Sequence, residues 1–191
     1  MPLVAQIAKR AGQGGGWAVY YAARAAATAA NRRRERRPLA PDTQRRLARL
    51  FPTVDLVRVR VTAGATLPAN WLVRPASVTG MTFGFDVYTI LDGDLEHDYR
   101  RMLLLIHELV HVRQVSELGE AAFARRYGEE WLTQGGYTGM PLEREARDFV
   151  SRLPFDPARY REEHPELAAI AGADPLSAFF HWLELGRRAQ G

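Results

Sequence analysis

A nearly continuous apolar run lies near the start of the chain. The run at 17–30 is rich in alanine, which has the highest intrinsic helix propensity, so a helix is expected there. A second helix is predicted to begin at Pro41, because proline is well tolerated in the first turn, and to end at Phe51 and Pro52.

The period then changes from helical to two. Valine and arginine alternate strictly over 57–61, which predicts a half-buried strand whose arginines face water. A second strand is predicted at 81–90, where aromatic and β-branched residues are bounded by Gly80 and by the turn sequence Asp92-Gly93.

From Asp98 onward the helical period returns. Phe123, Tyr127 and Trp131 follow one another at four-residue spacing, so we expect them to face a core. The predicted helices of this half cover 98–119, 120–132, 142–153 and 175–188. Strands followed by a run of helices indicate an α+β fold.

Composition narrows the chemistry. With 191 residues, 47% of them hydrophobic, the chain is suited to one domain, alone or with an appendage. The absence of cysteine excludes thiol catalysis and disulfides, so a metal would have to rest on His, Asp and Glu. The apolar run 17–30 includes Arg24 and is shorter than the roughly 20 residues of a membrane span, and its basic residues follow it, unlike those of a secretory leader. We therefore expect a cytoplasmic protein, with export by a non-classical route left open.

The N-terminal part is strongly basic. Residues 1–50 contain eleven basic and two acidic residues, a net charge of +9, whereas residues 51–191 have a net charge of −5. Such a segment is suited to an acidic partner or an anionic membrane surface, and less to nucleic acid. Because Lys9 is the single lysine among 26 basic residues, a run of arginines is less informative here, and we expect 31–42 to be a solvated, partly flexible linker.

The most informative stretch is His-Glu-Leu-Val-His at 107–111. On a helix, a spacing of four residues places His107 and His111 on one face, where both imidazoles can bind one metal ion while Glu108 stands beside it as a base. The flanking apolar residues predict a buried helix, where an unpaired carboxylate is costly. This is the signature of zinc metallopeptidases. The alternative is a pair of hydrogen-bonded core histidines with Glu108 on the solvent side.

Catalytic zinc usually has three protein ligands, so a further His, Asp or Glu is required. Glu143 and Glu145 both lie on the helix predicted after the glycine-rich loop. They stand about 200° apart around that helix, so one of them at most can face the metal.

The residues at 103–114, preceded by those at 82–88, resemble the metallopeptidase domain associated with extracellular contractile injection systems. Residues 141–146 resemble the Glu-x-x-Ala helix of minimal gluzincins, in which the first glutamate binds zinc, and this resemblance favours Glu143. Many gluzincins have Asp or Asn four positions after that glutamate, where this chain has Arg147 followed by Asp148. The outer partner of His107 therefore differs from the family pattern.

The resemblance implies a zincin-like α+β fold, with a small sheet packed on the motif helix and a helical half after it. Residues 1–40 would add an alanine-rich helix and an arginine-rich linker. The metallopeptidase domain would cover 41–191, with the motif core at 50–153 and a helical tail at 154–191.

The expected activity is zinc-dependent hydrolysis of peptide bonds, with Glu108 as general base. Tyr137 is a candidate donor to the oxyanion, and His97, His164 and His181 are alternatives. A peptide or protein substrate is expected to add to the edge of the strand at 81–90. The competing hypothesis is a non-catalytic zincin-fold module for binding or assembly. Glu108 favours the enzyme, because a structural zinc site needs no base.

Overall fold

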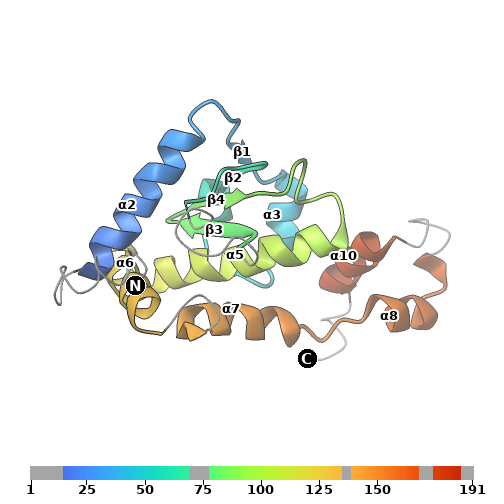
Figure 1. Cartoon of the computed structure of the whole chain (residues 1–191). Coiled ribbons are helices and arrows are strands. Elements are labelled where there is room, and N and C mark those ends of the chain that lie inside the picture. The colour runs from blue at the N-terminus through green and yellow to red at the C-terminus, as the bar shows by residue number, and fades with distance from the viewer. Residues whose placement is uncertain (1–14, 69–77, 135–138, 168–173, 186–191) are drawn as a thin grey trace.

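A computed structural model describes residues 15–68, 78–134, 139–167 and 174–185. In this part of the chain, helices surround one small mixed sheet, so the α+β class is confirmed (Figure 1). The α-helices are α2 (Gly15–Ala30), α3 (Pro41–Leu47), α5 (Tyr99–Leu118), α6 (Glu120–Thr133), α7 (Pro141–Ser151), α8 (Pro157–Glu163) and α10 (Pro175–Leu185). The strands are β1 (Arg37–Pro38), β2 (Arg60–Thr62), β3 (Gly80–Phe83) and β4 (Asp86–Thr89).

The sheet has the order β1-β2-β4-β3, which leaves β3 at one edge. β2 and β4 are parallel, and the two outer pairs are antiparallel. β3 and β4 form a hairpin whose turn includes Gly84 at φ +64°, a conformation that glycine adopts without strain.

Helix α5 crosses one face of this sheet (Figure 1). Its apolar side chains pack with those of β4, α3 and α10 in the main core, which includes Val87, Leu105, Ile106 and Leu109. Ala146 on α7 is fully buried in the same core, so α7 packs close to α5.

A second core joins α2 to β3 and α6. Tyr20 of α2 is 2% exposed, and its ring lies edge-on to Phe83 and Phe123. Gly16 and Gly128 bring α2 and α6 so close that a Cβ on Gly128 would lie 1.9 Å from the carbonyl oxygen of Gly16. The predicted N-terminal helix is therefore confirmed, and it shares a core with the rest of the protein.

Both predicted strands need correction. In the segment predicted as a strand at 57–61, only the last two residues belong to a strand, β2. The chain before it forms a 3-10 turn at Leu56–Arg58, which buries both Leu56 and Val59, three residues apart. Val57 is left 65% exposed. The segment 81–90 is two strands and not one, since the chain reverses at Gly84.

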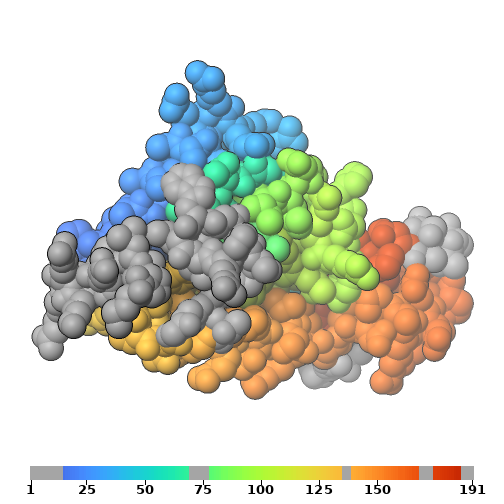
Figure 2. Space-filling view, in the orientation of Figure 1, coloured from blue at the N-terminus to red at the C-terminus, as the bar shows by residue number. Residues whose placement is uncertain are grey.

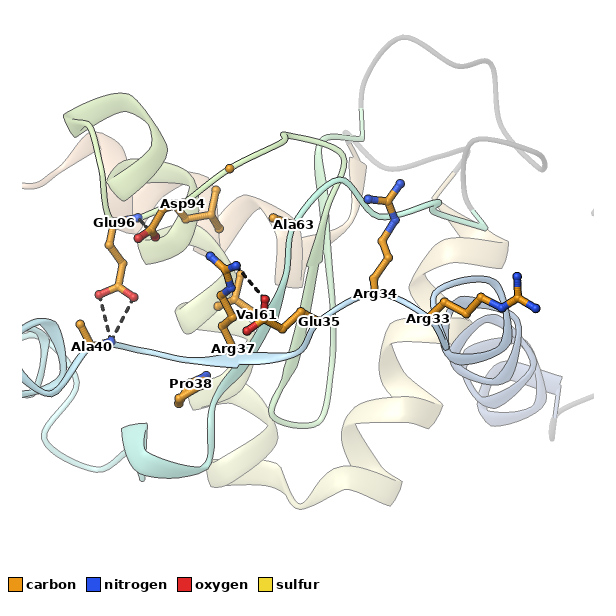
Figure 3. Close-up of a pocket in the computed structure, with 12 residues that line it drawn as sticks. Arg33, Arg34, Glu35, Arg37, Pro38, Ala40, Val61, Ala63, Asp94 and Glu96 are labelled. Carbon is orange, nitrogen blue, oxygen red and sulfur yellow. Dashed lines mark hydrogen bonds and ion pairs between the residues drawn. The ribbon is translucent and has the colours of Figure 1, made fainter.

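Most of the segment 31–42 is exposed, as expected for a solvated linker, but its two ends are tied to the rest of the protein. Asn31 is buried and joins the end of α2 to Thr66 through two hydrogen bonds, of 2.8 and 2.9 Å. Farther along, Glu96 accepts a hydrogen bond from the backbone N–H of Ala40, and Arg37 pairs with Glu35 (Figure 3). The segment thus carries an ordered strand and has acidic side chains among its arginines.

The helical tail contains α8, which the sequence reading missed, and α10, which it predicted. The signal for α8 was Asp156 before Pro157: the Asp156 carboxylate caps the helix by accepting from the N–H groups of Ala158 and Arg159. In the described part of the chain, every helix is too short or too polar to cross a membrane.

Candidate metal centre

Helix α5 presents His107 and His111 to the same side. Asp98 caps its first turn by accepting from the N–H of Arg101 at 2.9 Å, and the helix ends before Gly119. One helical turn separates the two imidazole rings, whose centroids lie 5.1 Å apart. His111 is buried, and the His107 side chain is 14% exposed.

Helix α7 brings Glu143 to these histidines. The Glu143 side chain is 1% exposed, with Oε2 3.2 Å from Nε2 of His107 and Oε1 3.4 Å from Nε2 of His111. One possible ligand atom from each of the three residues lies within 4.8 Å of the others. Among the described residues, this is the one group of three or more His, Asp or Glu close enough to hold a metal ion.

Glu145 points elsewhere. Its side chain is 47% exposed and pairs with Arg113 at 2.7 Å. The two-residue offset between Glu143 and Glu145 turns them to different sides of α7, as the helical period requires. Of the two candidates for a third ligand, the structure brings Glu143 to the histidines.

Gln114 determines which nitrogen of His111 carries a proton. Its Nε2 donates to the carbonyl of Leu142 at 3.1 Å and to the Glu145 carboxylate at 3.0 Å, so the amide orientation is defined by two acceptors. The Oε1 atom therefore faces Nδ1 of His111, at 2.8 Å, and can only accept. His111 is thus protonated on Nδ1.

The other ring nitrogen of His111, Nε2, makes no hydrogen bond that meets ordinary geometry. Nε2 of His111 is buried and has no hydrogen-bond partner among the described residues. In the neutral ring it carries a lone pair that faces an oxygen of Glu143, and two acceptors at that distance repel each other. A proton or a metal cation between them removes the conflict, so the donor set fits a bound cation.

Tyr127 of α6 holds the carboxylate of Glu143. Its hydroxyl donates to Oε1 at 2.7 Å, and its ring lies edge-on to His111. Sequence reasoning assigned Tyr127 only to the core, together with Phe123 and Trp131. Phe123 is buried, whereas Tyr127 and Trp131 are half-buried. No sequence spacing indicated the contact with Glu143, because it joins two different helices.

Glu108 faces the sheet and is 1% exposed. This burial excludes the alternative in which Glu108 lies on the solvent side of the helix. Thr82 of β3 donates its hydroxyl proton to Oε2 of Glu108 at 2.7 Å. Gly80 leaves room for the other oxygen, since a Cβ there would lie 2.3 Å from Oε1. Burial raises the pKa of Glu108, because the charged form loses solvation.

The charges of the group are strongly coupled. Burial opposes both ionised forms, yet the carboxylate of Glu143 raises the pKa of His111 to about 9. In return His111, together with hydrogen bonds from His107 and Tyr127, holds the pKa of Glu143 well below its usual range in spite of burial. Without a metal, a proton on His111 would thus occupy the place of the cation.

Of the candidate oxyanion donors, the three histidines lie away from this group. Tyr137 lies outside the described residues. His164 and His181 contact each other at α8 and α10, where they pair with Glu166 and Tyr160 respectively. Figure 1 shows these helices at the end of the molecule opposite to α2 and α6. His97 is exposed in the loop before α5.

A cleft of about 380 Å³ opens beside the group, lined in part by His107 and Glu108 from α5 and by Arg147 from α7. In the space-filling view, the surface of α7 (orange) lies directly below that of α5 (green) (Figure 2). No family model, curated protein or solved structure matches the chain.

Proposed function

We propose that this protein is a zinc-dependent metallopeptidase with a zincin-like fold, in which His107, His111 and Glu143 bind the metal. The observation that carries the proposal is the convergence of these three side chains, whose possible ligand atoms lie within 4.8 Å of one another, with Oε1 of Glu143 3.4 Å from Nε2 of His111. Two imidazoles and one carboxylate, with no thiolate in the chain, are a ligand set that suits catalytic zinc.

When bound, zinc polarises a carbonyl group and lowers the pKa of a coordinated water to about 7. Glu108 is the residue of this chain that would take the proton of the attacking water. Its pKa is raised by burial, which favours acceptance of a proton at Oε1 or Oε2. Thr82 orients the carboxylate, and Glu108 would later pass the proton to the leaving amine.

The edge strand β3 would bind the substrate. Ile90 donates its N–H to the carbonyl of Thr79, so residues 79, 81 and 83 direct their backbone groups toward β4. Gly80 and Thr82 therefore direct theirs to the outer edge, beside Glu108. A peptide added there as a further strand would have a bond next to the proposed base.

Zinc content per chain tests the metal site. Elemental analysis of the purified protein should give about one zinc, which is retained in Glu145→Gln and lost in Glu143→Gln and His107→Ala. Retention of zinc in Glu143→Gln, or its absence from the unmodified protein after incubation with the metal, would remove the proposal. Hydrolysis of a peptide library, abolished in Glu108→Gln with zinc retained, separates a peptidase from a zinc-binding assembly module.

A further inference from the structure

The cleft beside the metal-binding group has walls of two kinds. Leu103, Leu104 and Val150 provide apolar surface, and Arg147 provides a guanidinium group. An arginine binds a carboxylate through two parallel hydrogen bonds, a geometry that an ammonium group does not offer. The lining therefore combines an apolar surface with one guanidinium group.

The positions of these residues along the helices set a length scale. Arg147 follows Glu143 by four residues, so it lies one turn, about 5.4 Å, farther along the same side of α7. Leu103 precedes His107 by four residues on α5 and lies one turn away on that helix. One helical turn corresponds to about one or two residues of extended chain, which rises about 3.3 Å per residue.

We infer that the cleft binds a carboxylate attached to an apolar residue, and that the C-terminal end of a peptide is the ligand that fits. The inference rests on the proposed function, because the peptide bond to be cleaved would lie beside His107 and Glu108. The terminal carboxylate would pair with Arg147, and the last side chain would pack on Leu103, Leu104 and Val150. The protein would then act near the C-termini of its substrates.

An acidic side chain offers the same carboxylate, so the test must separate the two sources. Three probes serve this purpose: N-acetylleucine, N-acetylleucinamide, and N-acetylglutamic acid α-amide, which carries its carboxylate on the side chain. Their dissociation constants would be measured by NMR titration of the full chain, in the zinc-loaded and the zinc-free states. Arg144→Gln, an exposed arginine on the same helix, is the matched control for Arg147→Gln.

N-acetylleucine should bind roughly tenfold or more tightly than its amide, because a hydrogen-bonded charge pair is lost in the amide. The preference should disappear in Arg147→Gln, persist in Arg144→Gln and weaken in Arg147→Lys, which retains the charge and also serves if Arg147→Gln fails to fold. Equal binding of acid and amide would overturn the inference. A preference that survives Arg147→Gln but requires zinc would overturn it too, since the carboxylate would then bind the metal.

Tighter binding of the glutamic acid amide than of N-acetylleucine would assign the cleft to acidic side chains and overturn the C-terminal assignment. The zinc-free measurement keeps the two proposals separate. Absence of zinc from the unmodified protein defeats the proposed function, whereas loss of the carboxylate preference in a zinc-binding protein defeats only the inference about the cleft.

Discussion

The role of Gln114 can be tested by two substitutions that affect folding alike and metal binding differently. Gln114→Leu removes the acceptor for Nδ1 of His111 and leaves that buried N–H without a partner, whereas the Leu142 carbonyl loses one donor but keeps its backbone hydrogen bond within α7. Each such group costs about 1–3 kcal/mol. We expect the free energy of unfolding of the zinc-free protein to fall by about 1–3 kcal/mol. Zinc affinity should fall by about 10–100-fold, as for loss of an outer partner of a metal-binding histidine.

Gln114→Glu has a different expected signature. The carboxylate retains an acceptor for His111 and makes that imidazole a stronger base, so zinc affinity should be equal to or higher than that of the unmodified protein. Its second oxygen, however, replaces a donor and faces the carbonyl of Leu142 and the carboxylate of Glu145. Stability should therefore fall as it does in Gln114→Leu.

The measurements are urea unfolding of the zinc-free proteins and zinc affinity by competition with a chelator. Glu145→Gln is the control, because it keeps an acceptor for Gln114 and disturbs mainly an exposed ion pair with Arg113, worth about 0–1 kcal/mol. If both Gln114 variants weaken zinc binding in proportion to their loss of stability, Gln114 has only a structural role and the assignment of the His111 tautomer is refuted.

Three further predictions follow from the contacts around the site. Glu108→Gln should keep zinc and lower the peptidase rate by about 10²–10⁴-fold or more, because the carboxamide cannot accept the proton of water. An unchanged rate in a zinc-loaded protein would show that another group is the base. Gly128→Ala should lower the urea midpoint, because the added Cβ would lie 1.9 Å from the backbone oxygen of Gly16 and such overpacking costs about 1–3 kcal/mol, more than the roughly 1 kcal/mol that alanine gains in helix propensity. The control is Ala121→Gly, at an exposed site of α6, which should show only the loss of helix propensity. A Gly128→Ala protein that is more stable than its parent would contradict the close packing of α2 and α6. The folded-state pKa of His111 is raised from 6.5 to about 9, so the ion pair of His111 with Glu143 stabilises the zinc-free protein fully below pH 6.5, and this contribution is lost as the pH rises through about 9. Zinc affinity, measured by competition with a chelator, should rise over the same pH range because the metal displaces the proton. A flat pH profile would contradict the coupling to Glu143.

Local sequence patterns were sufficient for much of the helical architecture. The four-residue spacing of His107 and His111 placed both rings on one face of α5, because a helix returns to the same side after about one turn. Alanine content predicted α2, and Pro41 and Pro141 marked the starts of α3 and α7. These features depend on interactions between residues close in sequence, which a single chain displays directly.

The tertiary structure decided the contacts between helices that complete the site. Helical geometry excluded Glu143 and Glu145 from facing the two histidines together, and the packing of Ala146 against α5 placed Glu143 beside them. The bonds from Gln114 to α7 and from Tyr127 to Glu143 join elements that are separate in sequence, so no spacing could predict them.

The same limit explains the errors in the strands and the unpredicted burial of Asn31. Alternation at 57–61 was read as strand pairing, but Leu56 and Val59 are buried through a 3-10 turn that only their neighbours in the core select. Asn31 is polar, and its burial depends on Thr66, thirty-five residues away. The sequence by itself determined which residues could bind a metal. The packing of α5, α6, α7 and β3 decided which of these residues lie together and whether Glu108 is shielded from water, because burial and the meeting of distant side chains are properties of the assembled fold.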